Sequence, residues 1–230
     1  MNPGPSRLRA LLEVFLCSGL PSQALIGVAL GVAGLRPDKD GALSLSLLTS
    51  LTGLDTLILL SLVFTLLTRT GESPRAVLLG SRPVGREVLR GFVLVPWVFG
   101  IVLAAAVAIA RLAPQLIVPN PLASLASTWP QYVVFALTVI LAGGVREEVQ
   151  RAFILHRCEQ RLGGAEVGVI GWGLLFGVLH YVQGTSAMII TGLLGIFWSL
   201  IYLARRSVVA PMVSHASFNL IEVIGFGLAR

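Results

Sequence analysis

The sequence predicts an all-α fold, a bundle of transmembrane helices that forms a single membrane domain over residues 1–230. Two features of the composition favour it: of the 230 residues, 55% are hydrophobic and only 12% are charged, whereas charged residues make up about 25% of a typical soluble domain. The third observation is the length of the apolar stretches. A helix needs about 20 apolar residues to cross the hydrocarbon core of a bilayer, and the chain contains several stretches of about that length. We therefore expect an integral membrane protein.

Seven membrane spans are expected, at residues 11–34, 44–67, 91–110, 131–156, 166–183, 187–203 and 208–228. The first contains Pro21, which a membrane helix can accommodate as a kink. The basic connection between the second and third spans is expected to hold a short interfacial helix. Within the single domain, residues 1–128 comprise the N-terminal spans and this basic loop. Residues 129–230 comprise the last four spans and carry the motifs described below.

Arginine and lysine are distributed unevenly between the two ends of the predicted bundle. Cytoplasmic loops of membrane proteins favour these residues, so we expect a cytoplasmic N-terminus. Eleven of the 17 then fall on the cytoplasmic side: Arg7, Arg9, Arg69, Arg75, Arg82, Arg86, Arg90, Arg157, Arg161, Arg205 and Arg206. Four fall outside, Arg36, Lys39, Arg111 and Arg230, and Arg146 and Arg151 remain within a span.

The net charge of +6 is thus a signal of membrane topology. Nucleic-acid binding is not expected, because the arginines are scattered through short loops and form no continuous basic face. The compact loops and the lack of an organelle signal favour a bacterial inner membrane. The expected partners are therefore membrane lipids and a membrane-associated protein or peptide.

Ionisable side chains inside the predicted spans indicate where function resides, because each costs a few kcal/mol to insert into a membrane. A helical rise of about 1.5 Å per residue places four chemically capable side chains roughly 14 to 21 Å from the cytoplasmic ends of their spans. These are Glu147, His180, His215 and Asn219. The other ionisable groups are Asp55, Arg146, Glu148, Arg151 and Glu222. Three spans thus bring the four side chains to one depth, which predicts a site near mid-membrane.

Spacing within the spans supports this site. Phe176 and His180 are four residues apart, as are His215 and Asn219, so each pair shares one face of a helix. Both members of the second pair can therefore point into one cavity.

The adjacent carboxylates Glu147 and Glu148 project about 100° apart on a helix, so only one can face a given point. Glu147 and Arg151 are four residues apart with the acid first, the favourable order for an ion pair. We expect one carboxylate to be available for chemistry and the other to be held by Arg151 or Arg146.

At these residues the chain resembles a known family, the CAAX protease and bacteriocin-processing group of intramembrane peptidases, also called Abi or Rce1-like. Its motifs EExxxR, FxxxH and HxxxN correspond here to EEVQR, FGVLH and HASFN. The last two match fully. In the first, Arg151 comes one residue early, and Ala152 stands where the family arginine is expected. The resemblance covers roughly residues 130–225.

This resemblance implies an endopeptidase that hydrolyses a peptide bond of a membrane-associated substrate, with its catalytic core at residues 129–230. Glu147 and His180 would activate a water, and His215 and Asn219 would stabilise the oxyanion. Glu148 and Arg151 complete the set of implied site residues. A buried carboxylate near an imidazole suits general base catalysis, and paired N–H donors suit a tetrahedral intermediate.

Three alternatives stay open. The Glu, His and His set could hold zinc with water as fourth ligand, although asparagine is a poor zinc ligand and no HExxH spacing is present; we expect no cofactor. A proton-coupled transporter could relay ions through the buried acids, but the chain lacks the internal repeat of many transporters. An inactive membrane scaffold or immunity-type protein would be expected to lose Glu147, His180, His215 or Asn219. None of these four is lost, and the displaced Arg151 leaves this alternative open. The two cysteines, Cys17 and Cys158, indicate no metal site or disulfide framework.

Overall fold

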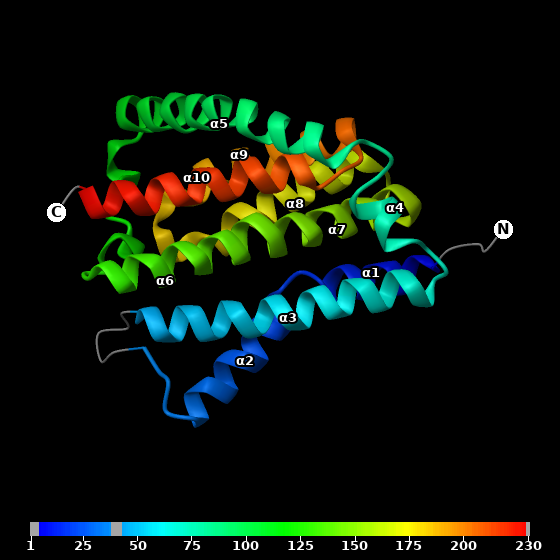
Figure 1. The fold of residues 1–230 in the computed structure, drawn as a ribbon, viewed down its shortest axis with the longest axis horizontal. Coiled ribbons are helices and arrows are strands. Elements are labelled where there is room, and N and C mark those ends of the chain that lie inside the picture. The colour runs from blue at the N-terminus through cyan, green and yellow to red at the C-terminus, as the bar shows by residue number, and fades with distance from the viewer. Residues whose placement is uncertain (1–4, 38–42, 229–230) are drawn as a thin grey trace.

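The computed structural model describes residues 5–37 and 43–228. Within these ranges every regular element is helical, as predicted (Figure 1). The α-helices are α1 (Arg7–Leu16), α2 (Leu20–Val32), α3 (Leu45–Arg69), α4 (Pro74–Leu78), α5 (Val84–Leu112), α6 (Trp129–Val139), α7 (Glu148–Arg161), α8 (Ala165–Leu179), α9 (Thr185–Arg205) and α10 (Val209–Leu228). A π-helix, η3 (Ile140–Glu147), joins α6 to α7, and the 3-10 helices η1 (Pro114–Leu116), η2 (Pro121–Ser124) and η4 (Tyr181–Gln183) lie in connections.

Five segments of the described chain are long and apolar enough to cross a membrane: Arg7–Val32, which combines α1 and α2, and the helices α3, α5, α9 and α10. The protein is therefore a helical integral membrane protein, but the predicted seven spans are not confirmed. The expected span at 166–183 is helix α8, whose 15 residues reach only about 22 Å, less than the core of about 30 Å. The expected span at 131–156 is divided among α6, η3 and α7.

The first predicted span is interrupted before Pro21 rather than kinked at it. Helix α1 ends at Leu16 and α2 begins at Leu20. Gly19 between them has a φ of +84°, a left-handed conformation that glycine adopts without steric cost. Pro21 lies in the first turn of α2, where its missing N–H would have had no helical partner. The break is therefore set by the glycine, and the proline only starts the next helix.

The basic connection contains the short helix that the sequence predicts. This helix, α4, starts at Pro74, and the side chain of Ser73 caps it by accepting a hydrogen bond from the backbone N–H of Ala76. Serine before a proline-started helix is a common N-terminal signal, so Ser73 and Pro74 set where this helix begins.

Most of the basic residues gather at one end of the bundle, where α1, α3, α5 and α10 begin or end next to α4 (Figure 1). Several of them are ion-paired there. Arg157 contacts Glu13 at 2.5 Å and Glu72 at 2.6 Å, and Arg205 contacts Glu87 at 2.5 Å. These pairs connect helices that are distant in sequence. Of the residues expected at the other end, Lys39 and Arg230 lie outside the described ranges.

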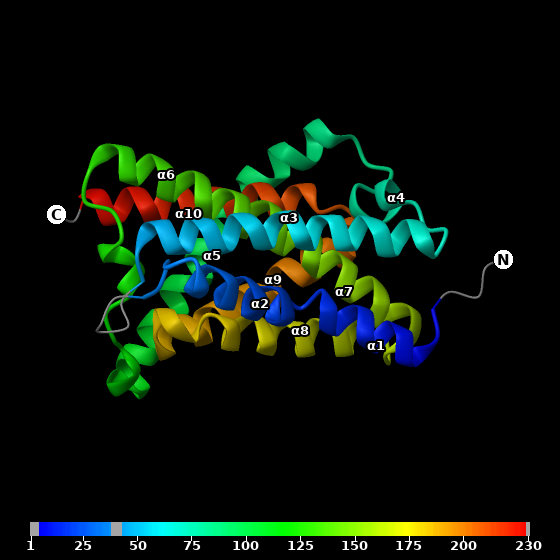
Figure 2. The same ribbon diagram turned by 90° about the horizontal axis from the view of Figure 1, so that it is seen from below.

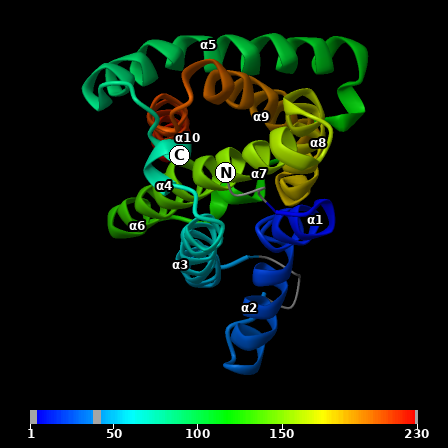
Figure 3. The ribbon, with the colours of Figure 1, turned by 90° about the vertical axis from the view of Figure 1, so that its right-hand side faces the viewer.

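The hydrophobic core lies between the C-terminal helices. Buried side chains of α7, α8, α9 and α10 form one cluster around Phe153, Trp172, Phe176, Trp198 and Phe218. Helix α5 covers this core on one side (Figure 1). Helices α1, α2 and α3 lie on the opposite side, in front of α7 and α8 in Figure 2. In Figure 3, which looks along the bundle, α7 occupies the centre between these two sets.

Candidate active site

The motif GGVREE forms the end of the π-helix η3 and the start of α7. π-Helical turns are rare and frequently occur at functional sites. The two glycines let α10 approach η3 closely. A Cβ on Gly143 would lie 2.2 Å from Nδ2 of Asn219 and 3.1 Å from Nε2 of His215, and a Cβ on Gly144 would lie 2.7 Å from Cβ of Ala216. The glycine pair thus brings the third motif against the first.

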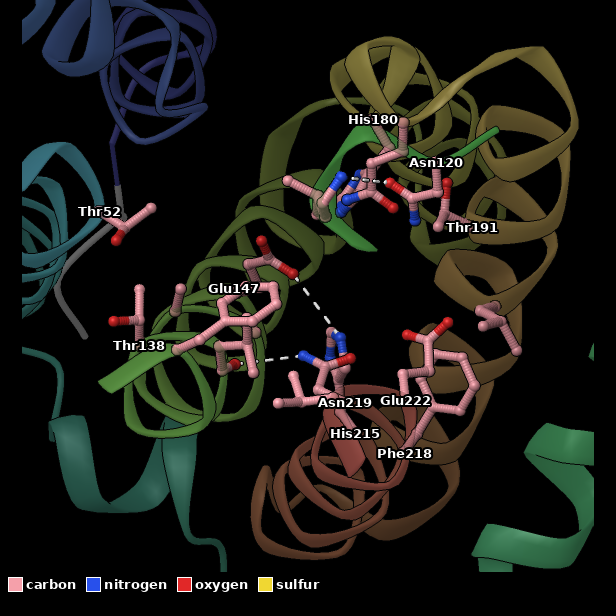
Figure 4. A pocket seen from close by; sticks show the side chains of 18 of the residues that line it. Thr52, Asn120, Thr138, Glu147, His180, Thr191, His215, Phe218, Asn219 and Glu222 are labelled. Carbon is pink, nitrogen blue, oxygen red and sulfur yellow. Dashed lines mark hydrogen bonds and ion pairs between the residues drawn. The ribbon is translucent and has the colours of Figure 1, made fainter. Parts of the chain in front are cut away.

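A cavity of about 160 Å³ lies where η3, α8, α9 and α10 meet (Figure 4). Glu147, His180, His215 and Asn219 all line it, together with Phe176. The four side chains that the helical rise placed at one depth in the membrane therefore do share one cavity. Their chemical roles remain predictions.

Glu148 is buried, and it is the member of the acid pair that Arg151 holds. Arg151 forms an ion pair with Glu148, three residues away, so the prediction that this arginine holds one of the two carboxylates is confirmed. Nδ1 of His215 lies 2.8 Å from Oε1 of Glu148. Since positions three and four residues along a helix are both neighbours of the starting residue, the early arginine still reaches the second glutamate. Arg151 therefore holds Glu148 although it stands one residue earlier than the arginine of EExxxR.

The guanidinium of Arg151 is fully buried. Its central carbon lies 4.9 Å from the ring centroid of Phe176 and 5.4 Å from that of Trp198. An arginine over aromatic faces is stabilised by cation–π attraction, which is strongest where water is excluded. Arg151 therefore links the EEVQR segment to α8, which carries FGVLH, and to α9.

Glu147 has one oxygen held and one directed toward the cavity. Oε1 lies 3.3 Å from Nη1 of Arg146. Oε2 is buried, has no hydrogen-bond partner in the described part of the chain, and lies 3.8 Å from Nε2 of His215. A carboxylate oxygen placed in this way is able to accept a proton from a molecule in the cavity.

Arg146 is held in turn by Asp55, which the sequence had left unexplained. Nη2 of Arg146 lies 2.5 Å from Oδ2 of Asp55. Asp55 is fully buried on α3 and accepts hydrogen bonds from Ser22, and from Gln23 at 3.1 Å, both on α2. The N-terminal helices thus contact the motif through a chain of polar groups that ends at Glu147.

His180 ends α8, and its hydrogen bond defines its tautomer. Nδ1 lies 2.7 Å from the backbone oxygen of Phe176. Because a carbonyl can only accept, Nδ1 carries the hydrogen, and Nε2 of the neutral ring keeps its lone pair. The ring centroid lies 4.5 Å from that of Phe176. The FxxxH spacing therefore positions an imidazole whose free nitrogen is a proton acceptor.

His215 and Asn219 extend from α10 into the cavity (Figure 4). The His215 ring stacks on Trp198, with centroids 3.8 Å apart, and the indole N–H of Trp198 donates to Ser214 Oγ at 3.0 Å. Nδ2 of Asn219 donates to the backbone oxygen of Val139 at 3.2 Å. One of its two amide hydrogens is thus engaged, and the other is available to a ligand.

Trp198, Asp55, Gly143 and Gly144 support the site, and sequence reasoning assigned a role to none of them. The glycine pair directly before two charged residues was a usable signal, because glycine in a helix often marks a close approach. Trp198 stood within an apolar span and gave no such signal. No group of three His, Cys, Asp or Glu side chains in the described chain is arranged to hold a metal ion.

Residues 128–221 match the family model of type II CAAX prenyl endopeptidase Rce1-like proteins. The predicted resemblance is confirmed. The Rce1-like segment begins at the start of α6, ends within α10 and contains all six predicted site residues. It indicates a peptidase of the CAAX type in a membrane-helical protein. No curated protein and no solved structure matches the chain.

Proposed function

We propose that the protein is an intramembrane endopeptidase that hydrolyses a peptide bond of a membrane-associated protein or peptide. The observation that carries the proposal is the single cavity shared by Glu147, His180, His215 and Asn219. Proton acceptors and hydrogen-bond donors thus surround one space inside a helical membrane protein. This is the combination that addition of water to a carbonyl requires.

Glu147 is the general base of this mechanism. Its Oε2, which has no hydrogen-bond partner among the described residues, takes one proton from water as the water oxygen bonds to the carbonyl carbon. His180 orients that water, since Nε2 is an acceptor when Nδ1 donates to Phe176. The C–N bond then breaks, and the proton held by Glu147 passes to the leaving amine. The products are a carboxylic acid and an amine. Water supplies the hydroxyl group of the acid and the hydrogen that the amine gains.

Asn219 and His215 stabilise the negative oxygen that forms on the carbonyl. The free amide hydrogen of Asn219 provides one donor. Nδ1 of His215 donates to the Glu148 carboxylate, and in the doubly protonated ring the Nε2–H is a second donor. Donors fixed before reaction are the most effective stabilisers of such an oxyanion. Glu148 and Arg151 therefore act by holding His215.

The proposal places the protein in a bacterial inner membrane, with the end of the bundle that is rich in arginine in the cytoplasm. Paired arginines at that end, such as Arg157 and Arg205, agree with the bias of cytoplasmic loops toward positive charge. The substrate is then a membrane-anchored chain whose cleavage site reaches the cavity within the membrane.

Comparison of protein termini in membranes with and without the chain tests the activity. New termini should appear with the wild type and with Glu166→Gln, an exposed carboxylate at the start of α8. They should fall by roughly 10²–10⁴-fold with Glu147→Gln, the range for losing general acid–base catalysis, while the variant still folds.

Unchanged termini combined with an ion flux that depends on Glu147 would reject the proposal in favour of a transporter. Unchanged termini and no flux would favour an inactive scaffold. Full cleavage by Glu147→Gln, lost on chelation and restored by zinc, would favour a zinc peptidase.

A further inference from the structure

A third carboxylate, Glu222, lines the same cavity and has no part in the mechanism above. It lies on α10 three residues after Asn219 and seven after His215, spacings that share one helix face. Figure 4 shows it projecting from α10 beside Asn219. Its side chain is accessible.

Glu222 differs from the other acids of this region in its lack of a partner. Glu147 contacts Arg146, Asp55 contacts Arg146, and Glu148 contacts Arg151. No hydrogen bond or ion pair joins Glu222 to any residue in the described ranges. An ionisable group inside a span without a partner is costly and indicates a function.

The surroundings of Glu222 favour a cation. No lysine or arginine lines the cavity among the described residues, and several polar groups on its wall are neutral, such as Asn120, Gln183 and Thr191. Asp55, Glu147, Glu148 and Glu222 together supply four carboxylates, against the two guanidiniums of Arg146 and Arg151. With His215 protonated, as in the mechanism above, and His180 neutral, the site still has an excess of one negative charge, and a positive ligand would offset it.

We propose that Glu222 forms a subsite for a cationic side chain, lysine or arginine, of the peptide substrate. This inference rests on the proposed peptidase function. Three residues of helix separate Glu222 from Asn219 by about 4.5 Å along the axis, and an extended peptide advances about 3.3 Å per residue. The cationic residue therefore lies one or two positions from the scissile carbonyl that Asn219 binds. It lies on the side toward the C-terminal end of α10, away from the arginine-rich end.

The test uses the purified full chain in detergent and a library of proteome-derived peptides, with cleavage sites identified by mass spectrometry. The wild type should show lysine and arginine enriched at one position within two residues of the cut. A matched peptide pair, with lysine or glutamine at that position, then gives a ratio of kcat/KM. Glu222→Gln should lower this ratio roughly tenfold or more, the scale for a hydrogen bond to a charged group.

Glu166→Gln is the control for the loss of a carboxylate elsewhere and should keep the wild-type ratio. Glu222→Lys should move the preference toward aspartate or glutamate. Cleavage by the wild type without enrichment of basic residues, or an unchanged ratio in Glu222→Gln, would overturn the subsite and leave the peptidase function standing. Cleavage of no peptide by the wild type would overturn both.

Discussion

Gly143 offers the sharpest test of how the site is built, because its missing side chain makes room for two motif residues. In Gly143→Ala the new methyl carbon would lie 2.2 Å from Nδ2 of Asn219, whereas ordinary contact begins at 3.4 Å. The Asn219 amide must therefore move by about 1.2 Å or the helices must separate. Either change disturbs the hydrogen bond from Asn219 to Val139 O, now 3.2 Å long.

The expected effect is on catalysis more than on folding, since the displaced group is the end of a flexible side chain. Misplacement of a catalytic group by about 1 Å can cost about 10²-fold in rate, and removal of one oxyanion donor costs about 10²–10³-fold. We expect kcat of Gly143→Ala to fall about 10²-fold in a peptide-cleavage assay, with a folded yield near that of the wild type.

Two comparisons make this prediction refutable. Gly171→Ala and Gly225→Ala add a methyl group where nothing lies within 4 Å, so both should keep wild-type activity. The double variant of Gly143→Ala with Asn219→Ala should be little worse than Asn219→Ala alone, because both changes remove the same interaction. Full activity in a folded Gly143→Ala variant would show that Asn219 does not act from this position.

Three further predictions concern stability, pH and metal. Arg151→Ala should reduce the folded yield and Tm, because loss of one partner of a buried ion pair costs about 3–5 kcal/mol; wild-type melting and activity would contradict this. Burial alone would raise the pKa of Glu72, but hydrogen bonds from four side chains outweigh this effect and lower the pKa from 4.5 to about 2. These side chains are Thr70, His156, Arg157 and Gln160. This contribution to stability is present above pH 4.5 and is lost as pH falls toward 2, so Tm should drop less over that range in Glu72→Gln; an equal drop in both proteins would refute it. Chelators should leave peptide cleavage unchanged, and a loss of activity that zinc restores would contradict the metal-free mechanism.

Much of the fold was predictable because it depends on local features of the chain. Long apolar runs predicted the helices α3, α5, α9 and α10. Most of the predicted ends of these helices lie within a few residues of the observed ones. The convergence of Glu147, His180, His215 and Asn219 was predictable for a similar reason. Helical rise fixes depth in a membrane and spacing fixes the helix face, so two local rules were sufficient to place them at one cavity.

The ion pairs were less predictable, because they depend on which helices become neighbours. Adjacent glutamates lie at the junction of a π-helix and an α-helix, so spacing alone could not decide which of them Arg151 holds. The partner of Asp55 lies 91 positions away in sequence, on η3. Glu13 and Glu87 were not recognised as buried acids, and each is held by an arginine from a distant helix, Arg157 and Arg205.

The adjacent carboxylates of Glu147 and Glu148 have different environments. This difference explains how a membrane protein can use both of them. Glu148 contacts Arg151 and His215 and is almost fully buried, so its charge is used in holding the imidazole. Glu147 shares Arg146 with Asp55, which lies nearer to that guanidinium, at 2.5 Å against 3.3 Å. The arginine therefore orients Glu147 while most of its charge is balanced by Asp55. Since Asp55 lies outside the Rce1-like segment, an N-terminal helix supplies the carboxylate that shares Arg146 with Glu147.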